Sequence, residues 1–214
     1  MAVTYTSYLK VDELLRLQQP LSDGPQHDEM LFIVIHQVYE LWFLQQLHDG
    51  RHLRQALERG DRATAAGTLL RMLTILKTMV SQIDVLETMT PVQFLSFRAR
   101  LENSSGFQSW QFRAFEFMLG KKNPRAIAMQ PEGSPERAAL ETAFHAPTLW
   151  DAFLQFLVRS GLEVPAAALA RDVTQPLAAD PAVQALLLQV YRTRPDERGI
   201  CELLVDLDEG IQEW

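Results

Sequence analysis

The sequence predicts an all-α protein, a helical bundle of long antiparallel helices. Apolar residues recur with the 3.6-residue period of a helix over long stretches, and glycine and proline mostly mark where these stretches end. No sustained alternation of apolar and polar residues indicates a strand, and no internal repeat is present. We expect residues 1–214 to form a single all-helical domain, because this length is enough for one substantial core.

Two long helices joined by a tight turn are expected near the N-terminus. The first covers residues 27–59 and ends at Gly60. Asp61 is the expected N-cap of the second, whose apolar stripe continues through residues 69–86. Helices joined by so short a turn pack antiparallel, so we predict a helical hairpin.

Shorter helices are expected on both sides of this hairpin. Residues 5–19 carry apolar side chains at helical spacing and predict a helix, and residues 21–26 predict a loop. Residues 107–119 predict another helix, closed by Gly120. Further helices are expected to start at or near Ser134-Pro135, Pro147, Pro165, Asp180-Pro181 and Pro195.

The stretch from Thr90 contains a complete helix-start signal. Thr90 can cap the helix, the proline that follows it fixes φ in the first turn, and Gln93 completes a capping box. Phe94, Phe97, Arg98 and Leu101 then follow at i, i+3, i+4 and i+7. We therefore expect an arginine on the apolar face of this helix.

Composition and charge argue against several classes of function. The net charge is −7, from 20 basic and 27 acidic residues without a basic stripe, which disfavours nucleic-acid binding. No apolar run reaches the length of a membrane span, and the N-terminus lacks a secretion signal. The only cysteine, Cys201, excludes an internal disulfide. We expect a soluble, cytoplasmic protein that binds neither nucleic acid nor membrane.

One helical face between residues 27 and 43 carries a candidate functional group. Residues 30–35 are apolar all round, so we expect them to be buried. His36 lies one turn after Phe32 and one turn before Glu40, which puts a ring, an imidazole and a carboxylate on one stripe. Two interpretations stay open: a core histidine bonded to a neighbour, or a pocket wall with one titratable group aimed into an apolar cavity.

Two other polar features allow alternative interpretations. Arg98 could bind a carboxylate ligand through two parallel hydrogen bonds, or it could pair with Glu87 or Glu116 across helices. His48 and His52 are four residues apart and could meet one metal ion. The metal interpretation is the weaker one, because neither an HExxH pattern nor a second Glu-x-x-His set accompanies the pair.

Several long motifs resemble segments of a known family. They are residues 5–9 with the following DELLRLQQPLS, HDEMLFIVIHQVYELWF at 27–43, LETMTPVQFLSFR at 86–98, SSGFQSWQFR at 104–113 and, more weakly, LVDLDEGIQEW at 204–214. Together they extend over nearly the whole chain and resemble the tryptophan 2,3-dioxygenase family, haem enzymes that open the indole ring with O2. The resemblance implies the all-α fold of that family.

The resemblance also implies a reaction and residues that serve it. The expected reaction converts L-tryptophan and O2 to N-formylkynurenine on haem b, a step of tryptophan catabolism in the kynurenine pathway. His36, the implied catalytic residue, would accept the indole N–H, and Phe32 would pack on the ring. Arg98 would bind the substrate carboxylate, and Leu101 would line the apolar pocket.

Further positions follow from the same resemblance. Phe32, His36, Ser105 and Gly106 are expected to lie against the haem. Tyr5, Tyr8 and Leu9 are expected to reach into a neighbouring protomer's site, which implies a homotetramer. Phe94 matches a position that is a tyrosine in some members, so a hydroxyl contact is expected to be missing here.

The last predicted helix keeps its apolar period up to Trp214. Carboxylates, which suit the N-terminal half of a helix rather than its end, crowd this stretch at Glu202, Asp206, Asp208, Glu209 and Glu213. We therefore expect the helix to continue in a complete protein, and the resemblance places the axial haem histidine beyond Trp214, with no metal ligand before it. The alternative function is a non-catalytic, haem-free helical relative that binds an indole compound or serves in assembly.

Overall fold

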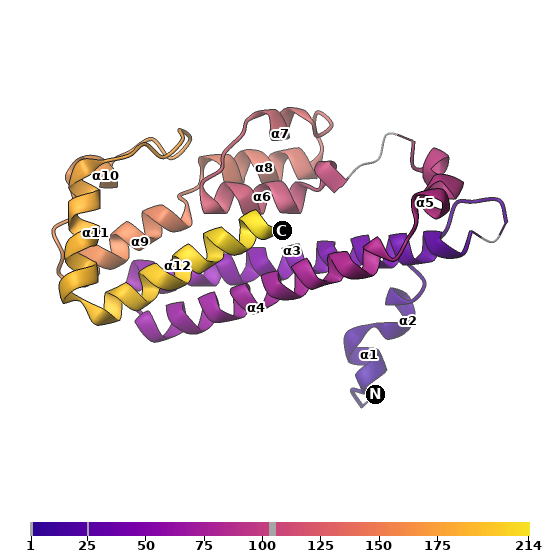
Figure 1. Cartoon of the computed structure of the whole chain (residues 1–214), viewed down its shortest axis with the longest axis horizontal. Coiled ribbons are helices and arrows are strands. Elements are labelled where there is room, and N and C mark those ends of the chain that lie inside the picture. The colour runs from indigo at the N-terminus through magenta and orange to yellow at the C-terminus, as the bar shows by residue number, and fades with distance from the viewer. Residues whose placement is uncertain (1, 25, 103–105) are drawn as a thin grey trace.

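Two long helices form the axis of the molecule (Figure 1). The computed structural model describes residues 2–24, 26–102 and 106–214, and within these ranges it is helical without any strand. Helices α3 (His27–Arg59) and α4 (Arg62–Glu87) run antiparallel, joined at Gly60, whose φ of 74° is left-handed. Asp61 caps α4 by accepting a 3.1 Å hydrogen bond from the backbone N–H of Thr64. The all-α class and the predicted hairpin are both confirmed.

The other main helices pack on this pair (Figure 1). Helices α6 (Trp110–Leu119) and α9 (Leu149–Arg159) lie on α3, α8 (Pro135–His145) lies on α6, and α12 (Pro195–Glu213) packs along α4. The largest fully buried side chains include Leu53, Leu69, Met72, Phe115, Phe153 and Phe156. The core therefore lies between the α3–α4 pair and the helices that cover it.

Most predicted helix starts are confirmed. Ser134, Thr148 and Asp180 each cap a helix with a side-chain oxygen. The remaining helical segments are α1 (Tyr5–Leu9), α2 (Val11–Leu14), α5 (Pro91–Arg98), η1 (Ala99–Leu101), η2 (Gly106–Gln108), α7 (Arg125–Ala128), α10 (Ala166–Leu169) and α11 (Pro181–Thr193). Among the described residues, no helix combines the length and the apolar character that a membrane crossing requires.

Two helices are shorter than predicted. Residues 5–19 do not form one helix, because Lys10 adopts a left-handed φ of 54° between α1 and α2. Neither short helix buries a residue, and Figure 1 shows both projecting away from α3, so tertiary packing does not extend them. The helix expected over residues 107–119 begins only at Trp110, because Ser109 caps it by accepting the N–H of Phe112 at 3.2 Å.

The expected burial of residues 30–35 is wrong for the single chain. Ile35 is buried, but the side chains of Met30 and Val34 are 42% and 38% exposed. Among the described helices, α4 and α5 contact α3, and they leave Met30 and Val34 exposed to solvent. The uncovered side of α3 is apolar, a feature that in soluble proteins often marks a contact surface.

An ion pair between a buried carboxylate and an exposed arginine ties the two long helices together. Asp49 on α3 is 1% exposed and binds Arg71 of α4 through two bonds, from Nε at 2.8 Å and from Nη2 at 2.6 Å. Burial raises the pKa of the Asp49 carboxyl, but hydrogen bonds from Arg71 and Gln45 outweigh it and hold the pKa below its ordinary value. The carboxylate therefore stays charged and keeps the helices in register.

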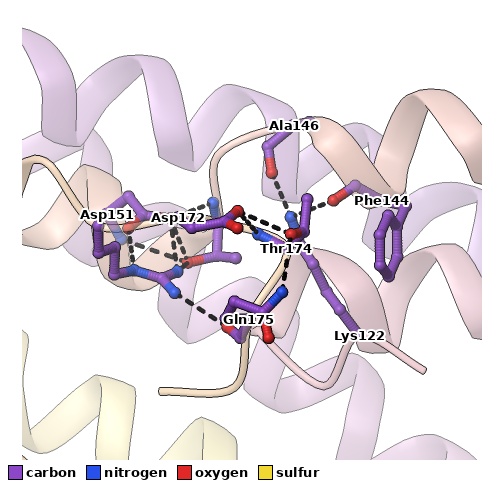
Figure 2. Close-up of polar contacts among 9 residues, drawn as sticks. Lys122, Phe144, Ala146, Asp151, Asp172, Thr174 and Gln175 are labelled. Atoms are coloured by element: carbon purple, nitrogen blue, oxygen red, sulfur yellow. Dashed lines mark hydrogen bonds and ion pairs between the residues drawn. The ribbon is translucent and has the colours of Figure 1, made fainter. Parts of the chain in front are cut away.

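A half-buried lysine lies at the junction of α8 and α9 (Figure 2). The Nζ of Lys122 donates to the carbonyl oxygens of Phe144, at 2.7 Å, and of Ala146, at 2.5 Å. Beside it, Asp151 accepts two hydrogen bonds from Arg171, at 2.6 and 2.9 Å. Burial lowers the pKa of Lys122 from 10.5 to about 8, because the charged amine loses water that the two carbonyls replace only in part.

This lowered pKa makes stability depend on pH in a predictable direction. Between about pH 8 and 10.5 the unfolded lysine holds a proton that the folded one has lost. The unfolded state then binds more protons, so the free energy of unfolding rises with pH. We expect this rise in the wild type relative to Lys122→Met, measured by urea denaturation from pH 7 to 10.

Comparison with a variant isolates the effect of Lys122 from other groups. The buried Cys201 thiol, whose pKa is raised to about 11, acts in the opposite direction above pH 9, but it is common to both proteins. Lys77→Met, at an exposed site on α4, is the matched control and should follow the wild type. Identical pH profiles for wild type and Lys122→Met would show that burial does not perturb this amine.

Candidate functional site

His36 lies on α3 in a defined tautomer. Its Nδ1 is 2.7 Å from the carbonyl oxygen of Phe32, one turn earlier. A carbonyl oxygen can only accept, so Nδ1 carries the hydrogen, and in the neutral ring Nε2 keeps a lone pair. The imidazole is half-buried. It can therefore accept a hydrogen bond from a ligand at Nε2.

Aromatic side chains from α3 and α5 form a cluster in which Phe32 contacts this imidazole. The rings of Phe32 and His36 lie 4.1 Å apart between centroids. Phe97 and Phe94 of α5 lie 5.5 and 5.9 Å from Phe32, and 5.5 Å from each other. We call these four side chains the aromatic wall. It combines ring faces with one hydrogen-bond acceptor, as sites for flat heterocycles do.

Local sequence signals place α5 against α3. The hydroxyl of Thr90 accepts the backbone N–H of Gln93, and the side chain of Gln93 accepts the N–H of Thr90, so the predicted capping box is confirmed. The capped helix directs Phe97 inward, where it is 0% exposed. Glu102, with a φ of 47°, ends the following 3-10 turn η1.

Arg98 follows Phe97 at the exposed end of α5. Its Nη1 donates to the carbonyl oxygen of Glu102 at 3.1 Å. Among the described residues, Arg98 forms no ion pair with Glu87 or Glu116. Glu116 is bound instead by Arg113 at 2.5 Å and by a lysine at 3.0 Å. The guanidinium is therefore held by a backbone carbonyl rather than by a carboxylate.

The other predicted site residues do not all meet at the wall. Leu101 is half-buried in η1, and Gly106 begins η2. Tyr5 and Tyr8 are 77% and 76% exposed on α1, where Leu9 is also exposed. Within the described chain these three are away from the wall (Figure 1), and Ser105 lies outside the described residues.

Glu40, predicted on the stripe of His36, has a different role. Its carboxylate accepts a 2.8 Å hydrogen bond from the side-chain amide of Gln111, which also donates to the Glu40 carbonyl oxygen at 3.0 Å. The residue therefore ties α3 to α6. Sequence spacing gave it the correct face of α3 but could not reveal this partner on another helix.

Sequence reasoning missed the buried carboxylate of Glu29 in the first turn of α3. Glu29 is 2% exposed and accepts the backbone N–H groups of Leu21, at 2.7 Å, and of Ser22, at 3.3 Å. Burial raises the pKa of Glu29, but these two backbone hydrogen bonds and the charge of Arg100 hold it below its ordinary value. The sequence did contain a signal for this role: an acidic residue in the first turn of a predicted helix, directly after a predicted loop whose N–H groups need acceptors.

The remaining histidines are spread over the surface. His48 and His52 are exposed on α3, and His145 is exposed at the end of α8, its Nδ1 2.9 Å from the carbonyl oxygen of Glu141. Within residues 2–24, 26–102 and 106–214, no three His, Cys, Asp or Glu side chains come together as a metal site.

The C-terminal residue of α12 packs beside the helix that carries His36. The ring of Trp214 lies 4.7 Å from Phe112, 5.4 Å from Phe43 and 5.9 Å from Tyr39. Tyr39 is one turn of α3 beyond His36, and its hydroxyl donates to the Met79 carbonyl oxygen at 3.1 Å. The end of α12 therefore lies next to the functional stretch of α3.

Fold and site together describe an all-helical protein with a candidate small-molecule site on its longest helix. A model of the family "Tryptophan 2,3-dioxygenase" matches residues 1–132. A tryptophan 2,3-dioxygenase of Herpetosiphon aurantiacus is 54% identical over 213 residues, covering 100% of this chain and 82% of the relative. Those of Anaeromyxobacter sp. (strain K) and Pseudomonas fluorescens are 51% and 40% identical, each over 100% of this chain and over 79% and 75% of their own lengths.

These matches go far beyond a shared fold. The chain belongs to the tryptophan 2,3-dioxygenase family, and the resemblance found in its motifs is confirmed. It is an enzyme of the dioxygenase class.

Proposed function

We propose that this protein opens the indole ring of L-tryptophan with O2 to give N-formylkynurenine, in tryptophan catabolism through the kynurenine pathway. One observation carries the proposal: His36 presents Nε2 as a hydrogen-bond acceptor beside the ring of Phe32. Both residues lie in the part of the chain that the family model matches. Both oxygen atoms of O2 end on the two carbons of the cleaved indole bond, so atoms balance without another reductant.

Three side chains divide the work of binding the substrate. His36 accepts the indole N–H at Nε2, which its Nδ1–H bond to Phe32 keeps available in the neutral ring. The Phe32 ring packs on the indole face, supported from behind by Phe97. Arg98 binds the α-carboxylate, and Leu101 contributes an apolar contact next to it. These contacts hold the ring in one orientation for reaction.

Haem b is the cofactor of this proposal, and it would supply the iron chemistry that activates O2. Residues of this chain fit one face of a porphyrin, because half-buried Phe32 and His36 offer two adjacent rings, tilted by 36°, as a mostly apolar surface. Ser105 and Gly106 are proposed to complete that surface. A histidine that would hold the haem iron is proposed to follow Trp214.

A homotetramer in the cytoplasm is part of the same proposal. Exposed apolar side chains occur together on α1, with Tyr5, Tyr8 and Leu9, and on the uncovered side of α3, with Met30 and Val34. A patch of this kind is unfavourable in water and suits contact with another protomer. The lone, buried thiol is compatible with a reducing compartment.

The experiment measures tryptophan turnover by full-length, haem-loaded, reduced protein, from absorbance of the formylkynurenine product. Wild type should turn over L-tryptophan. His36→Ala should lower the rate by about ten-fold, the upper end of what one neutral hydrogen bond contributes. The loss should be smaller for 1-methyltryptophan, which has no indole N–H to donate.

Controls separate catalysis from folding. His145→Ala, at an exposed site on α8, should keep wild-type rates. Absence of any tryptophan turnover by haem-loaded wild type would reject the proposal in favour of a haem-free indole-binding relative. A His36→Ala protein that is less stable than wild type but keeps the wild-type ratio of rates for the two substrates would make His36 a core residue.

A further inference from the structure

A cavity lies between α3, α6 and α8, and its described lining shares no residue with the aromatic wall. Its volume is about 460 Å3, within the range of small-molecule sites. From His36 to Leu44, the lining residue of α3 nearest to the wall, α3 rises about 12 Å, so the two sites do not overlap. Apolar side chains make up most of its walls: Leu44, Leu47, Trp110, Ala114, Met118, Ala139, Ala143 and Pro147.

A close approach of α6 to α3 shapes one wall of this cavity. A Cβ atom on Gly50 would lie only 2.1 Å from the sulfur of Met118. The missing side chain therefore lets Met118 lie across α3 while still lining the cavity. On the other side, α8 contributes the small side chains of Ala139 and Ala143, which leave space rather than fill it.

Two arginines give the cavity its charge. Arg51 and Arg54 are three residues apart and therefore lie on one face of α3. The Nε–H of Arg54 is buried and finds no hydrogen-bond acceptor within the described chain. Its nearest carboxylate oxygen, Oε1 of Glu58, is 3.7 Å away, beyond hydrogen-bond length. The buried Nε–H is therefore unfavourable in the free protein. The Arg54 side chain as a whole is 31% exposed, so its charge can attract an anion in the cavity.

Among the residues that the structure describes, no carboxylate lines this cavity, although the chain has a net charge of −7. Its ionisable lining groups are Arg51 and Arg54. A ligand's carboxylate would therefore meet opposite charge, whereas the ammonium group of an amino acid would meet like charge. We propose that this cavity is a second ligand site, which binds small carboxylates with a compact apolar body and disfavours zwitterionic amino acids. This goes beyond the proposed dioxygenase function and does not depend on it.

Titration calorimetry of the full chain with 2-naphthoate tests the proposal. We expect saturable binding at one site per chain, and Arg51→Gln and Arg54→Gln should each weaken it by about ten-fold or more, the usual effect of losing a charge-assisted hydrogen bond. The neutral 2-naphthamide should bind more weakly than the carboxylate, with an affinity that these substitutions leave unchanged. L-Tryptophan should displace 2-naphthoate poorly.

Matched variants locate the binding. Arg192→Gln, at an exposed arginine on α11, and Arg98→Gln, beside the aromatic wall, should bind 2-naphthoate as wild type does. Ala139→Leu should weaken both ligands, because it fills the cavity whatever the ligand charge. Absence of saturable binding, loss of binding in Arg98→Gln instead of the α3 variants, or displacement by L-tryptophan at equal affinity would each overturn the proposal.

Discussion

Replacing Phe97 by alanine is expected to lower the free energy of unfolding by about 3–5 kcal/mol, the usual cost of removing a fully buried phenylalanine. The Phe97 ring is 0% exposed and packs 5.5 Å from both Phe32 and Phe94. Its removal loses apolar burial and leaves a void between α3 and α5 that the backbone closes only in part. Urea denaturation followed by circular dichroism measures the loss.

Two variants of the same helix show whether the ring itself is responsible. Leu95→Ala, at a side chain that is 67% exposed on the outer face of α5, should change stability by less than about 0.5 kcal/mol. Phe97→Leu keeps most of the volume and should lose less than about 1.5 kcal/mol. A loss for Phe97→Ala as small as that for Leu95→Ala would mean that α5 packs only loosely on α3.

The parts of the fold that were predictable from sequence depend on local interactions. The turn at Gly60 and Asp61 requires one left-handed residue and one capping carboxylate, and both residue types can be read directly. The capping box at Thr90 and Gln93 is equally local. These signals act within four residues of each other, so no knowledge of the packing was needed.

The parts that were not predictable depend on partners far away in the sequence. Apolar periodicity indicates which face of α3 avoids water, but not that the chain leaves Met30 and Val34 uncovered. Helical spacing over residues 5–19 could not show that α1 and α2 bury no residue, so that no packing extends the helix past Lys10. The burial of Glu29 was not predictable for the same reason. Its carboxylate is bound by the backbone of a loop, and apolar periodicity carries no information about a loop.

The candidate site also combines contacts that are local in sequence with contacts between distant segments. Phe32 and His36 were predictable as neighbours because four residues separate them on one helix, and their rings are 4.1 Å apart. The contact of α5 with this pair needed the structure, as did the backbone carbonyl that holds Arg98. Residue types therefore predicted the chemistry of the site, whereas its supports came from tertiary packing.

Arg98→Lys is expected to weaken L-tryptophan binding by about 1.5–3 kcal/mol, or about 10- to 150-fold in Kd. In the structure Nη1 of Arg98 donates to the Glu102 carbonyl oxygen at 3.1 Å, which fixes the plane of the guanidinium. The opposite edge, with Nε–H and one Nη2–H, carries two parallel donors that match the two oxygens of a carboxylate. Lysine keeps the charge but offers neither the plane nor the paired donors.

Indole has the ring of tryptophan without the carboxylate. It therefore distinguishes a role of Arg98 in binding the carboxylate from a purely structural role. Its affinity should be the same for wild type and Arg98→Lys, measured by calorimetry on the haem-loaded protein. Arg100→Lys, on the neighbouring turn, should affect neither ligand, since Arg100 pairs with Asp23 at 2.5 Å. Equal weakening of tryptophan and indole by Arg98→Lys would show that the bond to Glu102 shapes the end of α5 and that Arg98 does not bind the substrate.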